Sequence, residues 1–105
     1  MVVQEIKNRG DYDKALAGEK LVLIDCFATW CGPCKAIAPK VDEFSETFAA
    51  EVDVYKVDVD ECSELAAELG VRAMPTFIFF KNGQKLESVA GASPEPILAA
   101  INKFK

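Results

Sequence analysis

The chain has 105 residues, of which half are hydrophobic and 28% are charged, so we expect residues 1–105 to form one globular domain around a single core. Twelve Lys and Arg against 17 Asp and Glu give a net charge of −5, and no basic cluster occurs, which argues against nucleic-acid binding. Histidine is absent from the sequence, which excludes Ser-His-Asp catalysis, Cys-His catalysis and His-ligated metal sites. Carboxylate, lysine, hydroxyl and thiol groups remain as the reactive chemistry.

Neither a membrane segment nor a secretion signal is apparent. No run approaches the roughly 18 consecutive apolar residues of a membrane span, and the start, MVVQEIKNRGDYD, lacks a basic region followed by an apolar one. We therefore expect an intracellular protein that does not enter the membrane. The four cysteines, Cys26, Cys31, Cys34 and Cys62, are too sparse and too clustered for a secreted disulfide framework, so thiol chemistry explains them better.

The first half of the chain predicts strands alternating with helices. Residues 2–6 are a short strand candidate, and residues 11–17, ended by Gly18, a short helix. Residues 21–27 form a nearly unbroken apolar run, which is typical of the central strand of a parallel sheet. A long helix should follow, with Pro39 inside it as a kink, because proline cannot donate the helical hydrogen bond. Its apolar stripe consists of Ile37, Val41, Phe44 and Phe48.

The second half ends in a hairpin and a last helix. Residues 52–59 alternate like a strand, and a helix should open at Asp60 and close at Gly70. Asn82-Gly83 separates two antiparallel strands at 76–80 and 86–89. Ser93-Pro94 begins the final helix. The order β α β α β α β β α predicts an α/β fold, with a mixed sheet of about five strands flanked by four helices on both faces.

The segment from Trp30 to Lys35 (WCGPCK) carries the clearest chemistry, because it follows a buried strand and opens a helix. Two sulfurs three positions apart there are within reach of a disulfide, so they are able to cycle between dithiol and disulfide. The positive end of the helix favours a thiolate at Cys31, which makes it the attacking sulfur. Cys34 should be more buried and remain a thiol that resolves the mixed disulfide, while Pro33 preorganises the first helical turn.

Two other interpretations of this pair remain. Zinc sites use the Cys-x-x-Cys spacing twice, but the chain has no second copy and no histidine. A purely structural disulfide, or a pair of inert thiols, is the second alternative.

Asp25 interrupts the apolar strand, and a carboxylate at such a position needs an explanation. Burial should raise its pKa, while Lys56 of the next strand, on the same face as Val52 and Val54, should oppose that rise. Asp25 is either a proton acceptor for Cys34, directly or through one water, or an ordinary salt-bridge partner or strand end at solvent.

Met74-Pro75 and Gly91 are ambiguous on pattern alone. A Met74-Pro75 bond is either cis or simply the start of a strand, and Gly91 would by default be a turn glycine.

Taken together, these segments resemble cytosolic thioredoxins over essentially the whole chain. Cys-Gly-Pro-Cys is the dipeptide arrangement of that family, whereas disulfide isomerases usually have Gly-His and glutaredoxins Pro-Tyr between the cysteines. The resemblance implies the thioredoxin fold. It is carried by Trp30-Cys31-Gly32-Pro33-Cys34-Lys35, Asp25, Pro39, Lys56 within KVDVDE, Met74-Pro75-Thr76, Lys81-Asn82-Gly83 and Gly91-Ala92.

The resemblance also implies a role for each matching residue. Cys31 corresponds to the nucleophile, Cys34 to the resolving cysteine, Asp25 to the buried acid that assists deprotonation and Lys56 to its neighbour. Pro75 corresponds to the family's cis-proline beside the disulfide. The shallow surface that binds an extended substrate segment corresponds to Trp30, Gly32, Pro33, Met74, Pro75, Thr76, Gly91 and Ala92.

These expectations describe a monomeric protein-disulfide reductant with no bound cofactor. An NADPH-dependent thioredoxin reductase would restore the dithiol, so NADPH would be used only indirectly. Substrates of the family include peroxiredoxins, methionine sulfoxide reductase and ribonucleotide reductase. The expected location is the cytoplasm, and the small size allows access to the nucleus. The alternatives are a redox-independent binding subunit and a disulfide isomerase or oxidase.

Departures from the family pattern fall on a few positions. Phe27 stands where many relatives have tryptophan or serine, and Cys26 where phenylalanine is common. Cys62 resembles an additional cysteine of some animal thioredoxins, and is either a small side chain at a helix start or a regulatory or dimer-forming thiol. Gly70 and Ala73 stand where those animal proteins have further cysteines.

Overall fold

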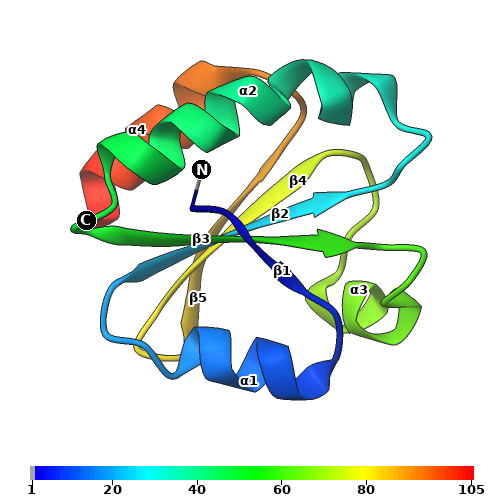
Figure 1. The fold of residues 1–105 in the computed structure, drawn as a ribbon, viewed down its shortest axis with the longest axis horizontal. Coiled ribbons are helices and arrows are strands. Elements are labelled where there is room, and N and C mark those ends of the chain that lie inside the picture. Colours follow the sequence, from blue (N-terminus) through cyan, green and yellow to red (C-terminus); the bar gives the residue numbers. More distant parts are fainter. Residues whose placement is uncertain (1) are drawn as a thin grey trace.

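Five strands form one mixed sheet in the computed structural model, which describes residues 2–105. The strand order is β1-β3-β2-β4-β5, so the predicted central strand is indeed in the middle (Figure 1). β1 and β3 run parallel to their neighbours on that side, and β4 and β5 are antiparallel, as the sequence predicts. The strands are β1 (Gln4–Ile6), β2 (Leu21–Phe27), β3 (Val52–Asp58), β4 (Thr76–Lys81) and β5 (Gln84–Ala90).

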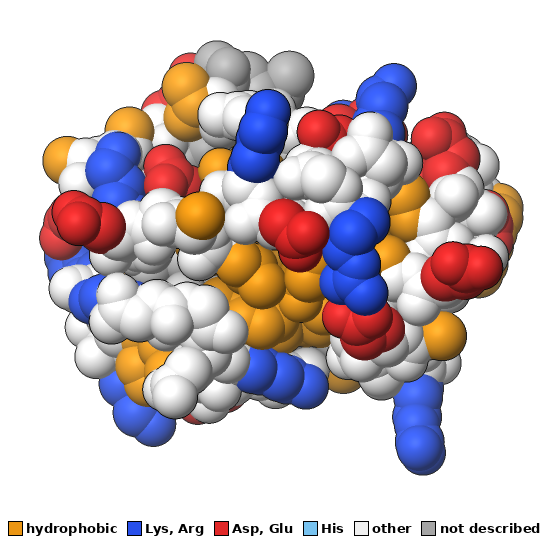
Figure 2. All heavy atoms as spheres, turned by 90° about the horizontal axis from the view of Figure 1, so that it is seen from below, with side chains coloured by type: hydrophobic (Ala, Val, Ile, Leu, Met, Phe, Trp, Pro, Cys, Tyr) orange, Lys and Arg blue, Asp and Glu red, His pale blue; other side chains and the backbone are white. Residues whose placement is uncertain are grey.

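Four helices cover the two faces of the sheet. α2 (Gly32–Thr47) and α4 (Pro94–Phe104) lie on one face, and α1 (Arg9–Leu16) and α3 (Ser63–Leu69) on the other (Figure 1). Seen from the side of α1 and α3, apolar side chains reach the surface in a hollow bordered by charged ones (Figure 2). Among the helices of residues 2–105, none is long and apolar enough to cross a membrane. The prediction of helices on both faces is confirmed.

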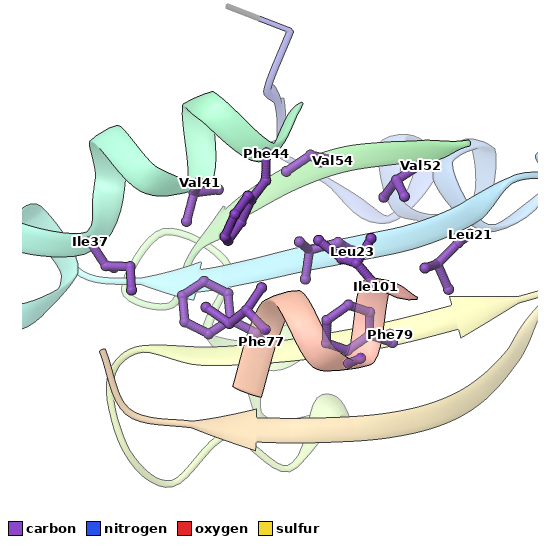
Figure 3. Close-up of a cluster of buried hydrophobic side chains, with 12 residues drawn as sticks. Leu21, Leu23, Ile37, Val41, Phe44, Val52, Val54, Phe77, Phe79 and Ile101 are labelled. Atoms are coloured by element: carbon purple, nitrogen blue, oxygen red, sulfur yellow. The ribbon is translucent and has the colours of Figure 1, made fainter. Parts of the chain in front are cut away.

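The larger core lies between the sheet and the α2 and α4 layer. Leu23 and Val54 point from the sheet toward Val41 and Phe44 of α2 and Ile101 of α4 (Figure 3). Full burial of such side chains stabilises the fold by about 1.5–3 kcal/mol each. The complete cluster is Leu21, Leu23, Ile37, Val41, Phe44, Val52, Val54, Phe77, Phe79, Ile97, Ala100 and Ile101.

The register of β2 and β3 shows that one face of the sheet changes from apolar to charged toward the end of β2. Leu23 is the partner of Val54 and Asp25 is the partner of Lys56, in neighbouring parallel strands. Because side chains alternate along a strand, Asp25 and Phe27 lie on the same sheet face as Leu23. The apolar layer therefore gives way to charged residues toward the end of β2, from which the chain enters α2.

The start of α3 differs from the sequence prediction. The helix begins at Ser63, with Cys62 as its N-cap, and not at Asp60. The carboxylate of Asp58 accepts hydrogen bonds from the backbone N–H groups of Asp60 and Glu61, at 2.9 and 3.3 Å, and holds a turn before the helix. α1 begins earlier than predicted, because Asn8 is its N-cap and accepts from the backbone N–H of Asp11 at 2.8 Å.

Other turns and helix ends predicted from the sequence are confirmed. Asn82 and Gly83 both have positive φ, 53° and 77°, as the hairpin turn requires. Gly70 ends α3 in the left-handed conformation, and Ser93 precedes Pro94 as the N-cap of α4. Pro39 lies inside α2, as predicted, and the kink expected there stays a prediction.

Candidate redox site

Cys31 and Cys34 form a disulfide at the beginning of α2. Cys31 is the N-cap residue of the helix, and its Sγ accepts a hydrogen bond from the backbone N–H of Cys34 at 3.1 Å. The two Cα atoms are 5.3 Å apart, an ordinary separation for a disulfide. The segment therefore supports a disulfide in one state and two thiols in the other.

Both cysteines are buried, and the prediction about their relative burial is wrong. Cys31 is 3% exposed and Cys34 6%, so Cys34 is not the more buried of the two. Cys31, the N-cap residue, packs with Ala28 of the loop that leaves β2. Phe27, Val59 and Met74 pack against this small cluster from three separate segments.

The beginning of α2 is suited to an anionic sulfur. Pro33 lies in the first helical turn, which contains no acidic side chain. The free N–H groups and the positive end of the helix dipole at this terminus stabilise a thiolate relative to a thiol. A reduced Cys31 would sit at that terminus.

Asp25 is a buried carboxylate with an unpartnered oxygen. The residue is 7% exposed, and its Oδ1 accepts no hydrogen bond from residues 2–105. Burial raises the pKa of Asp25 from 3.8 to about 7; the positive charge of Lys56 opposes this rise, and the negative charge of Asp42 adds to it. The predicted direction and the opposing effect of Lys56 are both confirmed, and a carboxyl with this pKa exchanges protons near neutral pH.

Lys56 occupies the predicted strand face but makes a contact that the sequence did not indicate. Its Nζ lies 5.6 Å from the centre of the Phe27 ring. Although Asp25 is its partner in the strand register, the two side chains form no salt bridge within the described residues. The ordinary salt-bridge explanation of Asp25 is therefore wrong.

Trp30 extends from the loop before α2 and is 68% exposed. Its indole Nε1–H donates to Oδ2 of Asp60 at 2.9 Å. Asp60 was not predicted as part of this region, because the two residues are 30 positions apart and no local pattern joins them. Gly32 and Pro33, next to the cysteines, are exposed as well.

A second loop reaches the disulfide from the start of β4. The Met74–Pro75 peptide bond is cis, as the resemblance implied, and Met74 packs against the cysteine cluster. The backbone N–H of Gly91 donates to the Pro75 carbonyl at 2.9 Å, which brings the segments at 75 and 91 together. Gly91 has a φ of 100°, a conformation that other residues rarely adopt. Thr76 is buried there, with its hydroxyl donating to the Ala73 carbonyl, and Ala92 is exposed.

The remaining two cysteines lie elsewhere. Cys26 is buried on the opposite sheet face, where burial raises its pKa to about 12. Cys62 is half-buried, and its Sγ lies 3.6 Å from the Ile6 carbonyl oxygen. Both are free thiols, so Cys31 and Cys34 are the two that are bonded.

Comparisons with known proteins agree with this geometry. A family model described as Thioredoxin matches residues 3–103. Malassezia sympodialis thioredoxin is 52% identical over 102 residues, covering 96% of this chain and 97% of that protein. Thioredoxin-1 of Schizosaccharomyces pombe is 48% identical over 100 residues, covering 95% and 96%. The crystal structure of the Malassezia sympodialis protein superposes with a TM-score of 0.92 at 50% identity, covering 97% of this chain and 90% of that one.

Proposed function

The chain belongs to the thioredoxin family, a family of thiol–disulfide oxidoreductases that reduce protein disulfides, and we propose that Cys31 attacks the substrate and Cys34 resolves the product. The observation that carries this assignment is the Cys31–Cys34 disulfide with Cys31 as the N-cap of α2. We further propose that residues 1–105 form one thioredoxin domain.

The reaction consists of two thiol–disulfide exchanges. The Cys31 thiolate attacks one sulfur of a substrate disulfide, so a bond forms between Cys31 and that sulfur, and the other substrate sulfur leaves as a thiolate. Cys34 then loses its proton and attacks Cys31. The mixed disulfide breaks, and the second substrate sulfur leaves as a thiolate. The substrate is then reduced, and Cys31 and Cys34 are oxidised to a disulfide.

Asp25 is proposed as the acceptor of the Cys34 proton, directly or through one water. A pKa of about 7 allows the carboxyl to accept a proton in one half of the cycle and release it in the other. Its unpartnered Oδ1 leaves an oxygen for that hydrogen bond. Lys56, whose charge favours the ionised carboxylate, is proposed as the residue that limits the rise in the pKa of Asp25.

Substrates are proposed to bind as extended segments over the shallow surface around the disulfide. Three observations support this surface. The indole of Trp30 is exposed, Met74 packs against the cysteines, and a hydrogen bond joins Gly91 to Pro75. A backbone contact of this kind accepts many sequences. The proposed residues are Trp30, Gly32, Pro33, Met74, Pro75, Thr76, Gly91 and Ala92.

The partners follow from the family and are proposals for this chain. The dithiol would be regenerated by an NADPH-dependent thioredoxin reductase, so the chain itself needs no bound cofactor. Peroxiredoxins, methionine sulfoxide reductase and ribonucleotide reductase are the proposed classes of substrate. We propose a monomer that acts in the cytoplasm, with access to the nucleus.

A coupled assay tests the assignment. NADPH oxidation is followed in the presence of thioredoxin reductase and insulin, whose disulfides serve as substrate. Cys31→Ser should abolish the chain's contribution to the rate, whereas Cys62→Ser, a change at a free thiol away from the disulfide, should retain it. Full activity of Cys31→Ser would contradict the assignment. If a double variant with serine at both Cys31 and Cys34 still bound its partner protein, the chain would act as a redox-independent binding subunit.

A further inference from the structure

Phe27 lies where the charged end of the sheet meets the disulfide. It is the last residue of β2 and, two positions after Asp25, lies on the same sheet face. Lys56 of β3 is the register partner of Asp25, so Phe27 is its diagonal neighbour. One face of two adjacent strands thus presents a carboxyl, an ammonium and an aromatic ring together.

The ammonium of Lys56 lies by the ring and not against the carboxyl. Its Nζ is 5.6 Å from the ring centre of Phe27, within the range of a cation–π attraction. A lysine opposite an aspartate in adjacent parallel strands has the length to reach the carboxylate. The structure instead shows the lysine directed to the diagonal position.

Phe27 is also held by apolar packing. It packs against the cluster formed by Ala28, Cys31 and Cys34, so it contacts both that cluster and Lys56. A ring held in this way offers the ammonium a partner that does not depend on the charge of Asp25. When Asp25 is protonated, the ring is the better partner; when Asp25 is ionised, the carboxylate competes for the lysine.

We propose that Phe27 is a positioning residue for Lys56, and that its ring draws the ammonium away from Asp25 and so favours the protonated carboxyl. The proposal deepens the role proposed above for Asp25 as a proton acceptor and rests on it. Phe27 itself touches no proton in the reaction; it acts through the lysine.

The other charges around Asp25 define how the test must be done. Lys56 from β3 and Asp42 from α2 are the charged groups that act on the carboxyl, and its β4 partner, Phe77, does not titrate. Cys31 and Cys34 do not titrate while they are bonded, so the oxidised protein removes the thiols from the measurement. Burial raises the pKa of Cys26, the next residue in β2, to about 12, well above the range of interest.

The test is a carboxyl-carbon NMR titration of Asp25 in the oxidised protein. Phe27→Leu keeps an apolar side chain and removes the ring. We expect the pKa of Asp25 to fall by about half a pH unit, the size of an ammonium–ring attraction at a partly exposed site. Phe27→Trp, which keeps a ring, should restore a value within error of the parent protein.

The Lys56→Met background separates the effect of the ring on Lys56 from other effects of the ring on Asp25. If Phe27 acts through Lys56, then Phe27→Leu should leave the pKa of Asp25 unchanged in the Lys56→Met background. A fall of the same size in both backgrounds would overturn the proposal, because the ring would then act only by excluding water. An unchanged or increased pKa in Phe27→Leu alone would also overturn it.

The pH profile of insulin reduction then distinguishes this proposal from the role of Asp25. In Phe27→Leu the lower pH limit of the profile should move down together with the Asp25 titration. If Asp25→Asn reduces insulin as fast as the parent protein, the role of Asp25 fails, while the NMR result still decides whether Phe27 positions Lys56.

Discussion

The indole of Trp30 and the carboxylate of Asp60 join two loops at the redox site. Trp30 Nε1 donates to Asp60 Oδ2 at 2.9 Å, so the segment before α2 is tied to the turn after β3. Trp30 remains 68% exposed, while the hydrogen bond holds the polar edge of its ring. An exposed aromatic ring that is held in one orientation next to Cys31 is suited to contact a substrate.

Trp30→Ala should weaken substrate binding more than it affects the chemical step. We expect KM for insulin to rise roughly five- to tenfold, because loss of an aromatic contact at an interface commonly costs more than 1 kcal/mol. The value of kcat should change less, since both cysteines remain. Steady-state kinetics at saturating reductase measure both constants.

Two controls accompany the Trp30 variant. Leu98→Ala removes another exposed apolar side chain, on α4, and should leave KM unchanged. The free energy of unfolding of Trp30→Ala should stay within about 1 kcal/mol of the parent value, because little of the ring is buried and one exposed hydrogen bond is lost. A change confined to kcat would argue against a role for Trp30 in binding.

Cys34→Ser should trap the reaction at its first covalent product. Cys31 still attacks a substrate disulfide, but serine at position 34 leaves no neighbouring sulfur to release the mixed disulfide. Non-reducing electrophoresis and mass spectrometry should show a 1:1 adduct that dithiothreitol reverses. Catalytic turnover by Cys34→Ser without such an adduct would show that another group resolves the intermediate.

The reduction potential of the Cys31–Cys34 pair should be more negative than that of the glutathione pool. Thioredoxins are the general example of a reducing dithiol pair, and this chain has their Gly32-Pro33 dipeptide. Equilibration with defined dithiothreitol ratios, read by thiol alkylation and mass, gives the value. A potential near that of the oxidising isomerases would instead assign the protein to disulfide formation.

The sequence predicted elements well where one local signal dominated. The apolar run at 21–27 matches β2 residue for residue, and Asn82-Gly83 forms the predicted turn. At Asp60 two interactions compete for one side chain. The pattern indicates a helix cap, but its carboxylate accepts from Trp30, and Asp58 caps the preceding turn. That competition depends on a residue 30 positions away, which no local pattern reveals.

The candidate site, like the fold, could be predicted from the sequence only in part. The spacing of Cys31 and Cys34 predicted their disulfide, and the interrupted strand predicted a buried Asp25 with a raised pKa. The direction of the Lys56 side chain was not predictable, because an ammonium placed between a carboxyl and a ring has two partners. The relative burial of the cysteines also depended on how separate loops pack.

Asp25 should make the stability of the oxidised protein depend on pH. Its pKa is about 7 in the folded state, against 3.8 for an ordinary exposed aspartate such as that of the unfolded chain, so the folded state holds the proton more tightly. Stability from this group is therefore fully present below about pH 4 and is lost as pH rises through 7. The total loss is of the order of 4 kcal/mol, from a difference of about three pH units at 1.36 kcal/mol each.

Asp25→Ala should accordingly be more stable than the parent protein at pH 8 by a few kcal/mol, and the advantage should disappear near pH 4. Urea unfolding at both values measures it, with Asp25→Asn as the variant that keeps the volume of the side chain. Asp13→Ala, at an exposed position of α1, is the matched control and should show no such pH-dependent advantage. The Asp25 variants should also reduce insulin more slowly, because Cys34 loses its proposed proton acceptor. Equal or lower stability of both at pH 8 would mean that the folded protein compensates the buried charge.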